Sequence, residues 1–109
     1  GLAMSSRNVY LSPEERAEAP VLYRALTWAA EAIRSGERRA AVLLEGVRTR
    51  IAAAKTARID YVELVRWPDL RPIVPEAKLV PGETVLVAAA VFFGTARLID
   101  NVRVAVPPA

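Results

Sequence analysis

The residue types best suited to chemistry gather within the first eight positions of the chain. Ser5 and Ser6 supply two hydroxyls, Arg7 supplies a guanidinium, and Met4 adds a backbone amide. Hydroxyls, amides and a guanidinium are donors that can converge on a phosphate group. The segment therefore predicts a phosphate-binding loop over residues 1–11. The alternative is a terminal tail without a role, or a remnant of cloning.

A second candidate is a pair of carboxylates, Asp60 and Glu63, which could share general acid–base work. They stand three positions apart in a segment with the composition of a strand. Strand side chains alternate between faces, so this odd spacing predicts that the two carboxylates lie on opposite faces of a sheet. We therefore interpret both as solvated or salt-bridged charges.

Two further sets of residues invite a functional interpretation, and for both we favour a structural one. Arg97 and Asp100 also stand three positions apart along a predicted strand, so their side chains are expected on opposite faces. Asp100 and Asn101 could satisfy backbone groups at a strand end. Trp28 and Trp67 could serve as stacking platforms, but packing in the core and at its rim is the simpler role.

The composition excludes several kinds of site. The 109 residues include no cysteine and no histidine, which removes disulfides, thiolate nucleophiles, the commonest general base and the commonest metal ligand. We expect no metal site and no catalytic residue on this chain alone. The sequence shows no membrane-spanning run and no signal-peptide pattern. We therefore expect a cytoplasmic protein without a membrane partner.

The chain is basic, with 15 Lys and Arg residues against 12 Asp and Glu residues and a formal net charge of +3. Its arginines are scattered among glutamates, and the longest arginine run is Arg38–Arg39. This pattern is typical of a solvated surface, and we expect no nucleic-acid partner. The alternative is a stand-alone basic interaction module that binds RNA or a protein partner through its arginine face.

Start and stop signals place the helices in the first half of the chain. Ser12 is a good N-cap and Pro13 suits the first helical position, so a helix is predicted to begin at Pro13. Pro20 must either kink that helix or start a second one. Apolar stripes at helical spacing then continue to Gly36, a natural left-handed cap. Another helix is predicted over residues 37–55.

The second half of the chain changes to the composition of strands. A β-branched and aromatic segment predicts a strand over residues 58–66. Residues 70–82 are predicted to form a loop with at most one short turn, because four prolines lie within this segment or just before it: Pro68, Pro72, Pro75 and Pro81. The most apolar stretch, 83–93, predicts a strand buried on both faces. It is expected to pair with a strand over 97–104 as an antiparallel hairpin.

Two helices followed by three strands predict an α+β fold, a small three-stranded antiparallel sheet covered on one face by two main helices. We expect residues 1–109 to form a single domain. In this scheme residues 12–57 are helical and residues 58–104 form the sheet.

Several segments together resemble the pantothenate synthetase (pantoate–β-alanine ligase) family. Met-Ser-Ser-Arg-Asn near the start and Arg-Leu-Ile-Asp-Asn about ninety residues later make the combination specific. The matches follow the family's order from residue 1 to about residue 104. The matching segments are Gly1–Asn8, Tyr10–Leu11, Glu15–Arg16, Ala19–Pro20, Asp60–Glu63, Val87–Ala90 and Gly94–Asn101.

The resemblance implies that this chain is the C-terminal domain of such an enzyme and acts as a lid over ATP. In the family, a Rossmann-like N-terminal catalytic domain carries a His-x-Gly-His motif, and this histidine-free chain lacks that domain. The enzyme activates pantoate with ATP to pantoyl adenylate, and β-alanine then displaces AMP to give pantothenate. The resemblance also implies Mg²⁺ bound with ATP, and a homodimer for the full-length enzyme.

The family pattern assigns roles to the opening loop. Ser5, Ser6 and Arg7 are expected to contact the ATP phosphates, and Met4 to contribute its backbone, as in the KMSKS-type loop of class I aminoacyl-tRNA synthetases. The isolated chain is expected to be inactive. Surfaces that the N-terminal domain covers in the family would be bare, so the fragment is also expected to self-associate.

Overall fold

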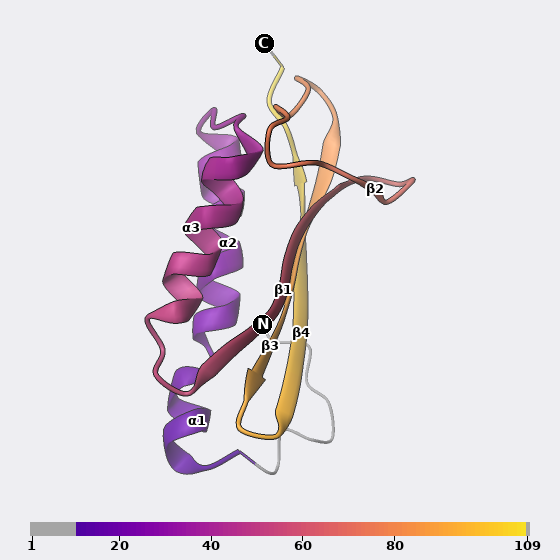
Figure 1. The fold of residues 1–109 in the computed structure, drawn as a ribbon. Helices are drawn as coiled ribbons and strands as arrows, with labels where there is room; N and C mark the ends of the chain where they lie inside the picture. The colour runs from indigo at the N-terminus through magenta and orange to yellow at the C-terminus, as the bar shows by residue number, and fades with distance from the viewer. Residues whose placement is uncertain (1–10, 109) are drawn as a thin grey trace.

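The computed structural model describes residues 11–108, which form two layers (Figure 1). Helices make up one layer and antiparallel strands the other. The helices come first in the chain and the strands follow. The predicted α+β class, with helices covering one face of a sheet, is confirmed.

The first helix is short and starts where the cap residues predict. α1 (Pro13–Glu18) follows the N-cap Ser12, and none of its residues is buried. α2 (Val21–Arg34) is a separate helix with Pro20 as its N-cap, so Pro20 starts a second helix instead of kinking the first. A six-residue helix has too few hydrogen bonds to be stable in isolation. α1 therefore depends on contacts with the rest of the fold.

α2 is the helix most deeply embedded in the molecule. Gly36 follows its end with φ +110°, the left-handed conformation that the sequence predicts for this position. Residues at helical spacing form the buried face of α2. They are Leu22, Ala25, Leu26, Ala29, Ala30 and Ile33.

α3 (Ala40–Ala52) is shorter than the predicted helix over 37–55. At its start, the Glu37 carboxylate accepts the backbone N–H groups of Arg38 and Arg39 at 3.1 and 3.0 Å. Arg39 has extended backbone angles and forms an isolated antiparallel bridge with Lys78. These contacts hold residues 37–39 in a non-helical conformation, and the helix begins only at Ala40.

The sheet has four strands, not the three that the sequence predicts. They are β1 (Ala57–Arg66), β2 (Arg71–Pro72), β3 (Thr84–Phe93) and β4 (Ala96–Ala105), all paired antiparallel in the order β2-β1-β3-β4. β2 therefore lies at one edge of the sheet and β4 at the other (Figure 1).

The additional strand, β2, arises within the segment predicted as a loop. Leu70 adopts a left-handed conformation with φ 61°, which reverses the chain after β1. Val65 then pairs with Pro72, and the Ile73 N–H donates to the Leu64 carbonyl at 2.9 Å. A proline is compatible with this place because an edge strand leaves one side of its backbone unpaired.

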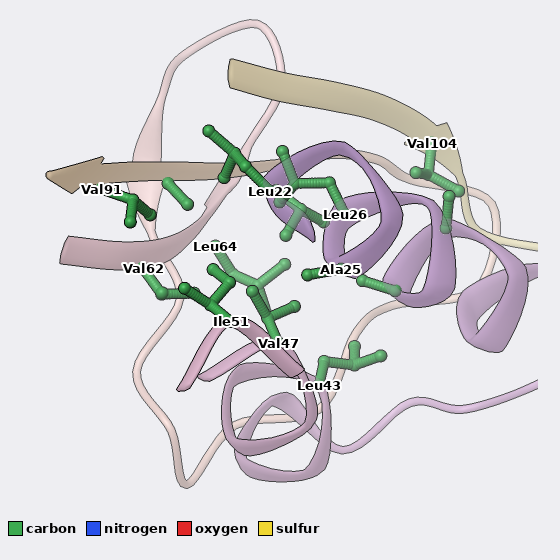
Figure 2. Packing of buried hydrophobic residues seen from close by; sticks show 14 of the residues in the cluster. Leu22, Ala25, Leu26, Leu43, Val47, Ile51, Val62, Leu64, Val91 and Val104 are labelled. Atoms are coloured by element: carbon green, nitrogen blue, oxygen red, sulfur yellow. The ribbon is translucent and has the colours of Figure 1, made fainter. Parts of the chain in front are cut away.

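β3 and β4 form the predicted hairpin, with Phe93 opposite Ala96 across a two-residue turn. One face of the sheet packs on α2 and α3, and Figure 2 shows leucine and valine side chains from both layers meeting there. Phe93 and Leu43 are among the fully buried side chains of this core.

β3 is buried on both faces in its central part, as its unbroken apolar sequence predicts. Val87, Ala89 and Val91 belong to the core beneath the helices. On the opposite face, Ala88 and Ala90 are also buried, although none of the described helices covers them. Ala90 lies between Tyr61 and Ile99 of the neighbouring strands, whose larger side chains shield it.

Candidate functional site

The residues of the predicted phosphate loop, Met4, Ser5, Ser6 and Arg7, lie outside the described residues. The structure does describe the segment that follows them, from Leu11 to the end of α1. The contacts of that segment are described below.

Leu11, the first described residue, is 6% exposed and belongs to the hydrophobic core. Ser12 and Glu15 then form a reciprocal capping box: the Glu15 N–H donates to the Ser12 hydroxyl at 3.1 Å, and the Ser12 N–H donates to the Glu15 carboxylate at 2.8 Å. These bonds satisfy two donors that a helix start leaves unpaired. The start of α1 is therefore fixed both by burial and by hydrogen bonds.

The first turn of α1 also lies against the turn between β3 and β4. Gly94 in that turn has φ +63°, and a Cβ at this position would overlap the carboxylate of Glu15. The left-handed φ favours glycine at this position, whereas the flexible Glu15 side chain could move away from a Cβ. This close approach ties the helix to the hairpin about eighty residues further along the chain.

The last residue of α1 is held by a second set of contacts, which we call the Glu18 clasp. The Glu18 carboxylate accepts the Lys55 N–H at 3.0 Å, the Thr56 N–H at 2.9 Å and the Thr56 hydroxyl at 2.6 Å. Hydrogen bonds from the Thr56 hydroxyl and backbone, followed by those from Lys55, lower the pKa of Glu18. The clasp joins α1 to the turn between α3 and β1.

A shallow hollow lies at the base of the predicted loop. Leu11, Pro13, Arg16 and Ala17 line it. Arg16 is exposed and brings a positive charge to this surface. The described lining of the hollow thus combines apolar walls with the Arg16 cation, and in the sequence it follows the residues predicted to bind phosphate.

The two carboxylates Asp60 and Glu63 do not lie on opposite faces, so that prediction is wrong. A bulge shifts the register of β1 between Ile59 and Tyr61. Because the bulge adds one residue, side chains on its two sides no longer follow the simple alternation between the faces of the sheet. Asp60 bonds Arg97 on the face without helices, with both Nε and a terminal nitrogen at 2.9 Å from Oδ2. Asp60 is salt-bridged, as expected, and does not pair with Glu63.

Arginine side chains cover aromatic rings on the same helix-free face of the sheet. Arg58 lies over Phe92 and Arg103 over Trp67, with guanidinium carbons 4.5 and 4.9 Å from the ring centroids. Such contacts combine cation–π attraction with shielding of the ring from water. Trp67 is 41% exposed, which agrees with a place at the rim of the core.

Trp28 packs between the two long helices. Its ring lies so close to Gly46 of α3 that a Cβ there would overlap it. The guanidinium of Arg50 covers the ring, 3.9 Å from its centroid. The packing role predicted for Trp28 is confirmed by these contacts.

Asp100 lies in the edge strand β4 and is 8% exposed. Its Oδ1 accepts the N–H of Asn101 at 2.9 Å. The two-residue turn makes Phe93 and Ala96 a hydrogen-bonded pair, so the N–H of Asn101 points away from β3, toward the free edge. Asp100 satisfies a backbone group, as predicted, but in the middle of the strand and not at its end.

Sequence reasoning missed the contacts that hold α1 in place. Glu18 and Thr56 stand 38 positions apart, and neither belongs to a local motif. The capping box, in contrast, has a local signature in the Ser12 and Glu15 spacing. Within residues 11–108, no group of three or more acidic side chains is placed to hold a metal ion, and no helix is long and apolar enough to span a membrane.

Comparisons with known proteins agree over nearly the whole chain. Residues 1–103 match the family model described as pantoate-beta-alanine ligase. The chain is 54% identical over 107 residues to the pantothenate synthetase of Geobacillus kaustophilus, covering 98% of this chain and 34% of the relative. It is 52% identical over 109 residues to that of Salinibacter ruber, covering 100% of this chain and 36% of the relative.

A solved structure gives the same result for the fold. The crystal structure of pantothenate synthetase from Thermus thermophilus superposes with a TM-score of 0.75 at 42% identity, covering 99% of this chain and 36% of that one. The chain therefore spans about a third of the length of the relatives that it matches.

Proposed function

Because this chain belongs to the pantoate-beta-alanine ligase family, we propose that it is the C-terminal, ATP-contacting lid domain of a pantothenate synthetase. The full-length enzyme would use ATP, pantoate and β-alanine, and would release AMP and pyrophosphate. The relatives are about three times as long as this chain, so the remaining part of such an enzyme would supply the catalytic groups and most substrate contacts.

The chemical role that we propose for the opening loop follows from the negative charge that develops on the ATP phosphates during the reaction. When pantoate attacks the α-phosphate of ATP, negative charge builds up on that phosphate and on the departing pyrophosphate. Donors held close to these oxygens stabilise the transition state more than the ground state. Ser5 and Ser6 would donate from their hydroxyls, Arg7 from its guanidinium, and Met4 from its backbone.

The observation that best supports this proposal is the fixed base of the loop. Leu11 is buried, Ser12 and Glu15 close a capping box, and Glu18 holds the other end of α1. A loop that must present donors to a charged transition state needs such a support, because catalysis depends on preorganised positions. The helix joins the loop directly to the body of the domain.

The same proposal includes a Mg²⁺ ion, a dimeric state and a location for the full-length enzyme. Mg²⁺ would arrive with ATP and be held by the phosphates and by the rest of the full-length enzyme. Among residues 11–108, no acidic cluster is suited to a metal ion. A homodimeric full-length enzyme and a cytoplasmic location remain part of the proposal.

Replacement of Arg7 tests the phosphate contacts. In the full-length enzyme, Arg7→Ala should lower kcat/KM for ATP by one to two orders of magnitude, because a charged hydrogen bond contributes about 1.5–3 kcal/mol. Steady-state kinetics at varied ATP measure this, and Arg48→Ala on the exposed surface of α3 is the matched control. An unchanged dependence on ATP would contradict the proposed role of Arg7.

The separate chain tests the lid assignment. Pure 109-residue protein, supplied with pantoate, β-alanine and ATP, should form no pantothenate. Its product can be measured against the full-length enzyme in the same assay. Turnover by the isolated chain would show that it carries a complete catalytic set and would overturn the proposal.

A further inference from the structure

A cavity of about 260 Å³ lies between α2 and the edge strand β4. α2 contributes side chains about one turn apart along one face, and β4 contributes residues from the middle of the strand. Apolar side chains form part of the wall, and polar side chains form the rest: Tyr23, Thr27, Arg34, Asp100 and Asn101. Pockets for drug-sized ligands usually measure about 300–1,000 Å³, so this space suits a smaller molecule.

Asp100 is the most deeply buried of the polar side chains in this cavity, at 8% exposed. Its Oδ1 accepts the Asn101 N–H, whereas its Oδ2 accepts no hydrogen bond from any other part of residues 11–108. In that part of the chain, the one fully enclosed side-chain nitrogen or oxygen without a partner is Nε of Arg38. Oδ2 is therefore open to the cavity and unpaired. A nearly buried carboxylate oxygen favours a ligand that donates a hydrogen bond to it, because an unmet acceptor in such a place is costly.

Arg34 brings the opposite charge to the same cavity. It is the last residue of α2, and helix side chains lean toward the helix N-terminus, which is the direction of the other lining residues of α2. The salt bridges within residues 11–108 involve other arginines, so Arg34 and Asp100 do not pair with each other. Two opposite charges thus line one small cavity without neutralising each other.

We propose that this cavity binds a small zwitterionic amino acid. The ammonium group donates to Oδ2 of Asp100, and the carboxylate accepts from the guanidinium of Arg34. Both contacts are charge-assisted hydrogen bonds, which are roughly twice as strong as neutral ones. The hydroxyl of Thr27 can bond to either end of the ligand, and the apolar part of the wall faces its methylene groups. The site is independent of the proposed lid function, because none of its residues belongs to the predicted loop over residues 1–11.

Titration of the 109-residue chain with amino acids of increasing length tests the site. The two layers of the chain share a hydrophobic core of their own, so the chain can be studied alone. Glycine, β-alanine and 4-aminobutyrate differ in the distance between their charges, and nuclear magnetic resonance follows the backbone amides of Thr27 and Asn101. At least one of the three should shift both amides with a dissociation constant of about 1–10 mM, because so few ligand atoms give limited affinity. Unshifted amides with all three amino acids would overturn the proposal.

Analogues with a single charge distinguish a zwitterion site from a site for one charge. Propylammonium keeps only the ammonium group, and propionate keeps only the carboxylate. Each should bind about tenfold more weakly, or worse, than the best of the three amino acids, because one charged hydrogen bond is missing. Equal binding of propylammonium would reveal a site for cations alone and would overturn the assignment to amino acids.

Asp100→Asn is the most informative variant, because the asparagine oxygen can still accept the Asn101 N–H while the negative charge is lost. It should weaken binding of the best amino acid about tenfold or more. Arg34→Gln should weaken binding about three- to tenfold, since this guanidinium is exposed to solvent. The matched controls, Glu31→Gln and Arg48→Gln, remove exposed charges outside the cavity and should stay within about twofold of the parent. Equal losses in Asp100→Asn and Glu31→Gln would show that the cavity is not the binding site.

Discussion

α1 and the α2–α3 pair are attached to the same sheet by different kinds of interaction. α2 and α3 bury leucine, isoleucine, valine and alanine side chains against β1, β3 and β4. α1 buries none of its own residues: the buried Leu11 and Ala19 flank it, and the Glu18 clasp bonds its last residue to the turn before β1. Burial supplies most of the free energy of folding, whereas directional hydrogen bonds fix orientation at a modest net gain. The comparison separates the two helices that burial holds on the sheet from a short helix that polar contacts hold at its last residue.

The largest effect should come from the apolar layer. Phe93→Ala removes a fully buried ring from β3, and such truncations cost about 3–5 kcal/mol of the free energy of unfolding. Urea titration of the chain measures this, with Val80→Ala at a 51% exposed position as the control. A loss below about 1 kcal/mol would mean that this layer does not dominate stability.

A smaller effect is expected where the two long helices meet. Gly46→Ala would push a Cβ into the Trp28 ring, and overpacking of this kind costs about 1–3 kcal/mol. The same change in a Trp28→Leu background should lose this penalty and gain up to about 1 kcal/mol from helix propensity. Urea titration gives the change in the free energy of unfolding that Gly46→Ala causes in each background. Equal changes in the two backgrounds would rule out the contact with the Trp28 ring.

The smallest effect should be the pH dependence of the polar attachments. Hydrogen bonds lower the pKa of Glu18 (from Thr56) and of Glu37 (from Arg39) below the ordinary value of 4.5. Their contribution to stability is therefore complete above pH 4.5 and is lost as pH falls through the lower folded-state pKa. Urea titrations at several pH values should show that the free energy of unfolding of Glu18→Gln falls less steeply below pH 4.5 than that of the parent. The same steepness in both proteins would contradict the hydrogen bonds of the Glu18 clasp.

Local patterns predicted the elements that burial holds together. The apolar stripes of α2, its end before Gly36 and the β3–β4 hairpin all have short-range signatures. Periodicity and cap residues are relations between residues a few positions apart, so they can be recognised in the sequence alone. The same holds for the N-cap at Ser12.

Contacts between distant residues account for the parts that were not predicted. α3 starts late because Arg39 pairs with Lys78, and the fourth strand exists because Leu70 turns the chain back onto β1. The bulge in β1 likewise moved Asp60 to another face. The phosphate-loop residues of the candidate site remain a prediction from the sequence, while the contacts that would support them came from the structure.

The carboxylate of Asp100 has a consequence for the solubility of the domain. Among the described strands, β4 lies at the edge of the sheet, and such edges are templates for pairing with another chain. Midway along this edge, the outward N–H of Asn101 is already bound by Asp100. A strand docking here would lose that donor and enclose a negative charge, which discourages the addition of further strands and hence the growth of an aggregate.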